Sequence, residues 1–300
     1  VEELVTEVLR CAEVSADHVL GLGVGLRAVV DPGRGVITGG PEAPGWSAEW
    51  TEFPVRDELA RILPWQQIIV DDTVRALGVA EARYGYGRGE SDFVYLFADT
   101  GIGSAVMIGR HPYVGPAGIA GEIGHVILDP DGDVCGCGRR GCIETKASSS
   151  AILRRASLLL GESAPAMEDV IRRADDGDAA MRRLLIEGGM ALGRGIGIML
   201  NLLGPRLIVI GGSAAGSDCY LEATIRSARE AALPQMVAET RIVRSELGPW
   251  AGARGAATLV LDAALDLSTG SVAGRSRRRS ADGQPWTAKT SAESELRGGS

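Results

Sequence analysis

Apolar positions along this chain follow two periods, one typical of helices and one typical of strands. Near the N-terminus they recur three and four residues apart, as on one face of a helix, at Val1, Leu4, Val5, Val8 and Leu9. Similar patterns predict helices over residues 56–63, 147–160, 178–203, 220–231 and 252–267. Glycine disfavours helix, so we expect the glycines at 188, 189, 193, 195 and 197 to be sites of close packing.

Short apolar segments between these helices predict strands. Residues 19–26 alternate apolar side chains with glycine, which indicates a central strand approached closely by other backbone. Apolar runs predict further strands over residues 68–70, 93–98, 105–108 and 207–210. Strands 93–98 and 105–108 should form a hairpin, whereas the Pro- and Gly-rich residues from 27 to about 46 should form a loop. The alternation of strands and helices predicts an α/β fold.

The helix after strand 68–70 has a well-marked start. Asp71, Asp72 and Thr73 are all good N-cap residues, and the helix they would begin carries Val74, Leu77 and Ala80 towards the core. An N-cap role alone would explain these acidic residues.

Composition limits the classes of protein to consider. With 300 residues the chain can bury a large core, and no apolar run is long enough to span a membrane. The formal net charge of -8 argues against a broad electrostatic grip on nucleic acid. Beyond Ser268 the composition turns to Ser, Gly and Arg, so we expect a folded part over 1–267 and a disordered tail over 268–300. The basic run at 275–279 is interpreted as a solubilising end rather than a DNA contact.

Four residues have the spacing and chemistry of a metal site. His125 precedes three cysteines packed into eight positions, Cys135, Cys137 and Cys142. One imidazole and three thiols suit tetrahedral zinc, and a complete set of four protein ligands indicates a structural role. The alternative is a set of unrelated buried thiols. The tight spacing and the absence of a secretory signal favour a reducing cytoplasm, and we expect the remaining Cys11 and Cys219 to be packed in the interior.

Two carboxylates flank the cysteine loop. Glu122 lies just before His125, and Glu144 follows Cys142. Either carboxylate alone would usually be a solvated surface charge. Held together by a metal loop, both can hydrogen-bond the hydroxyls of a polyol, which predicts a sugar site.

The segment Ala120-Gly121-Glu122-Ile123-Gly124-His125, continued through Cys135-Gly136-Cys137-Gly138-Arg139-Arg140-Gly141-Cys142-Ile143-Glu144, resembles the signature of the ROK family of repressors and sugar kinases. The resemblance extends more loosely from the first helix to about Leu267, including the turn at Gly211 and Gly212. It implies an actin-like, hexokinase-type fold with two lobes around a cleft and a structural zinc loop. It also implies a homo-oligomer.

The resemblance assigns roles to individual residues. It implies that Glu122, His125 and Glu144 contact sugar hydroxyls. It places the nucleotide side at two Gly-rich turns, whose backbone N–H groups could meet phosphate, namely Thr100, Gly101 and Gly103 in one turn and Gly211 and Gly212 in the other. Such a turn by itself more often indicates only a hairpin.

The sequence departs from the kinase pattern at the catalytic base. Kinases of the family carry an Asn-Asp pair at the start of the helix after strand 68–70, and the Asp takes a proton from the sugar hydroxyl. Counting back from Ala80 and Glu81 puts Thr73 at the Asp and Asp72 at the Asn. Threonine cannot act as that base. If that alignment is shifted by one residue, Asp72 matches the catalytic Asp instead and would be both the base and a sugar contact.

Three further departures concern the sugar and the phosphate. Arg27 and Ala28 replace a Pro-Gly turn that touches sugar in the family, and Glu42 stands where an Asn is expected. The family's first phosphate loop, an Asp-x-Gly-x-Thr hairpin, is not found before the first helix, and Asp31-Pro32-Gly33 comes too late to supply it. We therefore expect the chain to begin inside a domain, without a complete ATP site.

These observations support three hypotheses. The first, and favoured, is a non-enzymatic sugar-sensing effector domain of a ROK-type transcriptional regulator, which contacts DNA only through a module absent from this chain. The second is an ATP-dependent sugar kinase that uses magnesium and Asp72. The third is a non-catalytic assembly subunit with an empty cleft.

Overall fold

A computed structural model describes residues 1–40, 48–65, 67–161 and 165–265. Its strands are β1 (Leu22–Leu26), β2 (Val29–Asp31), β3 (Val36–Gly39), β4 (Ile68–Asp72), β5 (Phe93–Ala98), β6 (Ile102–Ile108), β7 (His111–Pro112), β8 (Leu207–Gly211) and β9 (Arg241–Arg244). Its α-helices are α1 (Glu2–Ala12), α2 (Val55–Ile62), α3 (Thr73–Tyr84), α4 (Glu144–Ala147), α5 (Ser149–Leu160), α6 (Met167–Asp175), α7 (Ala179–Leu203), α8 (Asp218–Ala231), α9 (Pro234–Glu239) and α10 (Ala251–Ala264).

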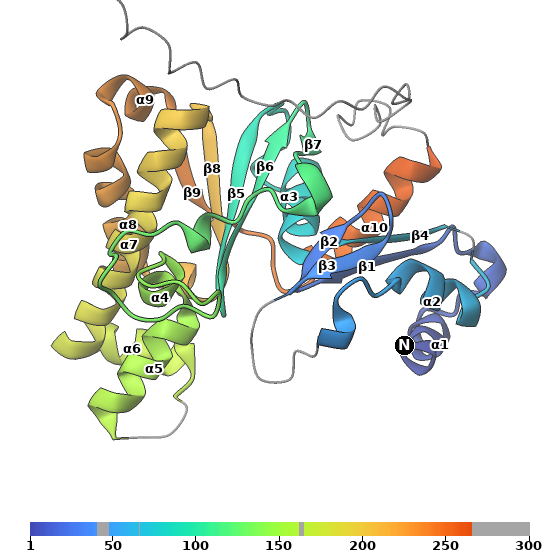
Figure 1. The fold of residues 1–300 in the computed structure, drawn as a ribbon, viewed down its shortest axis with the longest axis horizontal. Coiled ribbons are helices and arrows are strands. Elements are labelled where there is room, and N and C mark those ends of the chain that lie inside the picture. The colour runs from blue at the N-terminus through green and yellow to red at the C-terminus, as the bar shows by residue number, and fades with distance from the viewer. Residues whose placement is uncertain (41–47, 66, 162–164, 266–300) are drawn as a thin grey trace, which may run out of the picture.

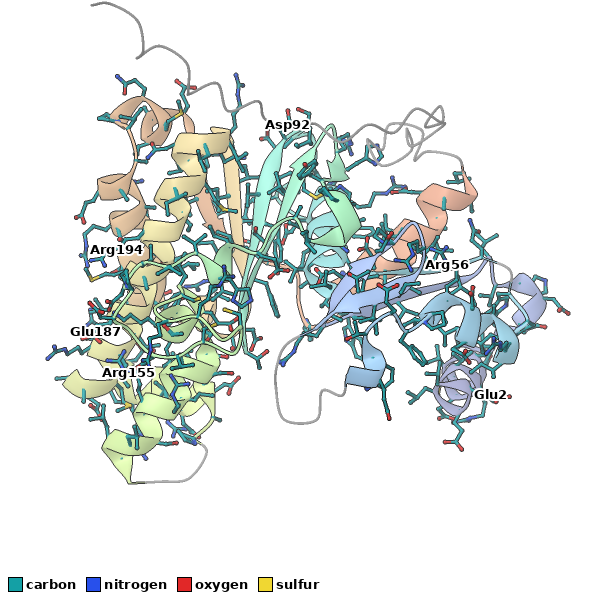
Figure 2. All side chains as sticks on the ribbon, viewed as in Figure 1. Glu2, Arg56, Asp92, Arg155, Glu187 and Arg194 are labelled. Atoms are coloured by element: carbon teal, nitrogen blue, oxygen red, sulfur yellow. The ribbon has the colours of Figure 1, made fainter. Side chains whose placement is uncertain are left out.

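The larger lobe is built on a five-stranded sheet of order β7-β6-β5-β8-β9 (Figure 1). β5 runs parallel to β8 and antiparallel to β6, and every residue of β8 is buried. Helices α4 to α8 cover one face of this sheet, and α3 with α10 covers the other. Arg155 of α5 and Glu187 of α7 form an ion pair at 2.6 Å on the outer side of the helical layer (Figure 2).

The smaller lobe contains two short sheets. β1 pairs in parallel with β4, and β2 pairs antiparallel with β3. α1 and α2 pack against these strands around Val30, Ile68 and Val70, and Arg56 of α2 hydrogen-bonds carbonyls of the β2–β3 turn (Figure 2). α10 packs on β1 and α3 and so joins the two lobes.

Most of the predicted elements are confirmed, including the 93–108 hairpin, but the loop predicted from residue 27 to about 46 is wrong in part. β2 and β3 form a hairpin there, and Gly35, with φ +69°, allows the tight turn that Pro and Gly had suggested. Strand β1 is not central, because in the described residues it pairs only with β4. The patterns also missed the helices α4, α6 and α9 and the strands β7 and β9.

The close-packing prediction is confirmed. A Cβ atom on Gly23 of β1 would lie 2.1 Å from the carbonyl oxygen of Ala256 in α10. In α7, a Cβ on Gly189 would lie 2.2 Å from the Tyr220 carbonyl, and one on Gly193 would lie 2.4 Å from the Thr224 carbonyl. The backbones of α7 and α8 therefore approach each other along a glycine stripe.

Of the apolar stripe on α1, only Val5 and Leu9 pack on the core, and Val1, Leu4 and Val8 are exposed. The expectation that both remaining cysteines are buried fails in part. Cys11 is also exposed, while Cys219 is buried as predicted. The predicted tail over 268–300 and Glu42 lie outside the described residues.

Candidate sugar and metal site

The predicted metal ligands come together in one loop. His125 ends the short 3-10 helix Ile123–His125, and the three cysteines lie in the loop that leads to α4. Single β-bridges, Ile127 to Cys142 and Val134 to Arg140, brace the loop. Gly141 has a φ of +68°, and a Cβ there would lie 1.5 Å from the Asp129 carbonyl oxygen, so this turn requires glycine.

Two distances within the cluster match the edges of a tetrahedral zinc site. Cys135 Sγ lies 3.5 Å from His125 Nδ1, Cys137 Sγ lies 3.7 Å from Cys142 Sγ, and the four ligand atoms all lie within 4.8 Å of one another. With Zn–S bonds of about 2.3 Å and Zn–N bonds of about 2.0 Å, a tetrahedron has edges of roughly 3.5–3.8 Å. The chemistry and the spacing of these donors both suit zinc.

Cys137 has an environment that favours the thiolate, the form that binds metals. Partial burial raises the pKa of this thiol, but hydrogen bonds from the backbone N–H and guanidinium of Arg139, together with those from Cys135 and Cys142, outweigh burial and lower that pKa to about 6. Cys135 differs, because burial raises its pKa to about 12. A metal ion would have to displace the Cys135 proton.

His125 faces two partners with its two ring nitrogens. Nδ1 points to the cysteine cluster, and Nε2 lies 3.7 Å from Glu122 Oε2. Metal at Nδ1 would leave the ring proton on Nε2, where it can be donated to a ligand. Partial burial raises the pKa of Glu122, His125 lowers it, and Asp72 and Glu144 raise it further. The four residues predicted to bind sugar thus lie in one electrostatic neighbourhood.

Glu144 links the cysteine loop to the β5–β6 turn. Its Oε2 accepts a hydrogen bond from Ile102 N at 3.0 Å, and its Oε1 lies 3.7 Å from Cys135 Sγ. A Cβ on Gly101 would lie 2.7 Å from Glu144 Oε2, so this turn and the carboxylate are packed together.

The two Gly-rich turns predicted for the nucleotide side meet at the carboxyl ends of β5 and β8. A Cβ on Gly212, whose φ is +98°, would lie 2.3 Å from the Ala98 carbonyl oxygen. Asp99, which sequence reasoning missed, joins these turns: its Oδ1 accepts hydrogen bonds from Ser213 Oγ at 3.1 Å and Ser149 Oγ at 3.2 Å. The only signal in the sequence was an acidic residue preceding the Thr100–Gly103 turn.

Asp72 caps α3, as predicted. Its Oδ1 accepts from Val74 N at 2.7 Å and Arg75 N at 3.0 Å, and Thr73 is the first helical residue. Burial raises the pKa of Asp72, although the charge of Arg75 opposes this effect.

Sequence reasoning also missed the ion pair beside this cap. Arg75 and Asp71 are 2% and 3% exposed, and Arg75 Nε lies 2.6 Å from Asp71 Oδ1. Arg75 also donates to the carbonyls of Val30 and Gly118. Arg75 therefore ties α3 to β2 and to the segment that leads to Glu122.

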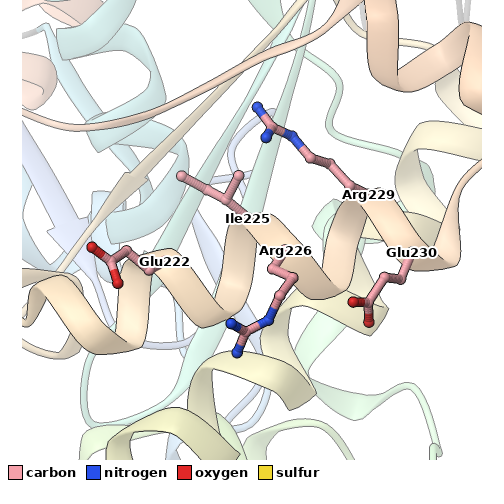
Figure 3. A pocket seen from close by; sticks show the side chains of 5 residues that line it. All are labelled: Glu222, Ile225, Arg226, Arg229 and Glu230. Carbon is pink, nitrogen blue, oxygen red and sulfur yellow. The ribbon is translucent and has the colours of Figure 1, made fainter.

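Beyond this site, a hollow on the outer face of α8 is lined by a single helix (Figure 3). Its residues are Glu222, Ile225, Arg226, Arg229 and Glu230. None of the predicted site residues lines it. No helix among the described residues is long and apolar enough to cross a membrane.

The fold and the cluster define an α/β protein of the hexokinase type, with a Cys3His group able to hold zinc; solved ROK structures share this fold. The chain belongs to the ROK family, whose model matches residues 1–263.

Both branches of the family are among its relatives. The chain is 30% identical to a glucokinase of Thermotoga maritima over 80% of this chain and 78% of that protein. It is 31% identical to the xylose repressor of Bacillus spizizenii over 67% of this chain, and the match spans about half of that repressor, 52%. The solved structure of a ROK family transcriptional regulator, a homologue of the E. coli MLC protein, superposes with a TM-score of 0.75 at 26% identity, over 87% of this chain and 67% of that one.

Proposed function

We propose that this chain is the sugar-sensing effector domain of a ROK-family transcriptional regulator. The observation that carries the proposal is the start of α3: Asp72 caps the helix through Oδ1, and Thr73, which matches the catalytic Asp of the family's kinases, has no carboxylate. A phosphoryl transfer to sugar needs a base within reach of the hydroxyl. Glu122, His125 and Glu144 could bind a sugar, while Thr73 supplies no base, so the site suits binding without catalysis.

The phosphate side supports the same proposal. The Asp99 carboxylate takes hydrogen bonds from Ser149 and Ser213 at the meeting point of the two Gly-rich turns. A nucleotide phosphate placed there would have to compete with Asp99 for the Ser149 and Ser213 hydroxyls. The Asp99 carboxylate therefore occupies the place where a kinase would need to bind a phosphate group of ATP.

In this proposal, zinc at His125, Cys135, Cys137 and Cys142 holds the loop, and Glu122, His125 and Glu144 bind sugar hydroxyls. Sugar between the lobes would shift their closure and so move a DNA-binding module outside this chain. The effect is a population shift, because the sugar favours one arrangement of the lobes over another.

Calorimetry with glucose, xylose and further hexoses and amino sugars tests the proposal. We expect at least one sugar to bind and Glu122→Gln to weaken it at least tenfold, about 1.4 kcal/mol. Glu52→Gln, which changes an exposed carboxylate paired with Arg34, is the matched control and should leave affinity unchanged. An unaltered affinity in Glu122→Gln would remove this residue from the site.

The glucokinase resemblance keeps a sugar kinase as the second candidate, with Asp72 as base and ATP and magnesium at Thr100, Gly101, Gly103, Gly211 and Gly212. The test is ADP release in the presence of sugar, ATP and magnesium. We expect none above the sugar-free blank. ADP that appears with wild type and disappears with Asp72→Asn would establish the kinase instead.

A further inference from the structure

Arg27 lies at the edge of the proposed sugar site and has no acidic partner among the residues that the structure describes. Its Nη1 donates to Thr100 Oγ1 at 3.0 Å, and the structure records no ion pair for it within the described part of the chain. Arg27 differs in this respect from Arg34 of the same lobe, which lies 2.6 Å from Glu52. The remaining guanidinium nitrogens of Arg27 are available to a ligand.

The strand register shows where Arg27 lies. β1 and β4 are parallel, with Leu26 opposite Asp72, so Arg27 follows the carboxyl end of β1 beside the start of α3. Thr100, its hydrogen-bond partner, follows the carboxyl end of β5, which is parallel to β8. Arg27 therefore stands between the carboxyl ends of two parallel strand pairs, the edge at which open α/β sheets bind ligands.

The same turn connects Arg27 to Glu144, one of the two carboxylates proposed to bind sugar. Thr100 contacts Arg27, and two residues later Ile102 N donates to Glu144 Oε2 at 3.0 Å. Glu144 and Arg27 thus contact two residues of the same turn between β5 and β6. A neutral sugar would use the carboxylates and leave the guanidinium to water.

We propose, on the basis of the proposed sugar-sensing function, that the effector is an anionic sugar, a sugar phosphate or a hexuronate, whose anionic group Arg27 binds. Its hydroxyls meet Glu122, His125 and Glu144, while its phosphate or carboxylate meets the guanidinium beside Thr100. Arginine suits this task because its planar fork can donate two parallel hydrogen bonds to either anion. The Thr100 hydroxyl orients the Arg27 guanidinium by accepting a hydrogen bond from Nη1.

Calorimetry on matched ligand pairs tests the assignment: glucose with glucose 6-phosphate and glucuronate, and N-acetylglucosamine with its 6-phosphate. We expect an anionic member to bind at least tenfold more tightly than its neutral parent. Arg27→Gln should bring the ratio of the two affinities close to one and should change the affinity for the neutral sugar little. Arg34→Gln, the matched control on the same lobe, should keep the ratio. The preference should also shrink as salt screens the charge.

The outcomes separate this inference from the function on which it rests. A neutral sugar that binds as tightly as its anionic partners, or a ratio that survives Arg27→Gln, overturns the role of Arg27 and leaves the sugar sensor intact. Inorganic phosphate alone that binds as tightly as the sugar phosphate overturns recognition of a sugar anion. Binding of no member of any pair overturns both proposals.

Discussion

At the scale of single residues, the buried pair of Arg75 and Asp71 offers a sharp test of stability. Arg75→Met leaves Asp71 as an unpaired buried charge, so we expect the free energy of unfolding to fall by about 3–5 kcal/mol. Arg34→Met breaks an exposed pair, whose side chains are 56% and 58% exposed, and should cost less than about 1 kcal/mol. Urea unfolding measures both, and equal losses would show that the buried pair has no special role.

Asp72 gives a second test at this scale, which separates a cap from a base. Asp72→Ala removes the acceptor for Val74 N and Arg75 N, so the free energy of unfolding should fall by about 1 kcal/mol. Asp72→Asn should retain nearly full stability, because Asn caps helices about as well as Asp. If Asp72→Asn lowers the stability as much as Asp72→Ala does, the negative charge of Asp72, and not its capping hydrogen bonds, stabilises the fold.

At the scale of elements, the contact between α7 and α8 depends on glycine. Gly193→Ala would put a Cβ 2.4 Å from the Thr224 carbonyl oxygen and 2.6 Å from Ser227 Cβ, so we expect a loss of about 1–3 kcal/mol by overpacking. Gly252→Ala in α10 is the matched control, since the nearest atom, Leu77 Cδ2, lies 3.9 Å away. This control should stabilise the protein by about 0.5–1 kcal/mol through helix propensity.

Denaturant unfolding of the two variants should therefore give opposite signs. A Gly193→Ala protein as stable as the Gly252→Ala protein would contradict the close approach of the two helix backbones.

At the scale of the whole molecule, the cysteine loop joins the metal cluster to both the core and the proposed sugar site. Glu144 reaches the β5–β6 turn, and Ile143 packs into the core against Gly195 of α7. Loss of the metal should therefore disturb stability and ligand binding together, because a metal bound only in the folded state contributes folding energy.

Cys137→Ser tests this coupling. Metal analysis should find about one zinc per chain in the wild type and much less in the variant. The variant should also unfold at a lower temperature and lose sugar affinity. Cys11→Ser, which changes an exposed cysteine outside the cluster, should match the wild type in all three measurements. Full zinc content in Cys137→Ser would exclude Cys137 as a ligand.

The features that could be predicted from the sequence are those set by neighbouring residues. The metal ligands lie within 18 positions, the Asp72 cap contacts residues two and three positions away, and the buried strand β8 is one apolar run. Spacing, caps and periodicity carry this information because the interacting groups are close along the chain. Short elements such as β2 and β3 escaped because their patterns are too brief to separate from a loop.

Contacts between distant residues depended on the tertiary structure. Arg27 and Thr100 are 73 positions apart, Arg75 and Val30 are 45 apart, and Asp99 and Ser213 are 114 apart. No local pattern relates such pairs, since their meeting depends on the parallel pairing of β1 with β4 and of β5 with β8. The sequence alone thus indicated the family, the Cys3His cluster and the two carboxylates beside it. Chain packing decided that Asp99 faces Ser149 and Ser213 and that Arg27, which has no ion pair among the described residues, lies beside Thr100.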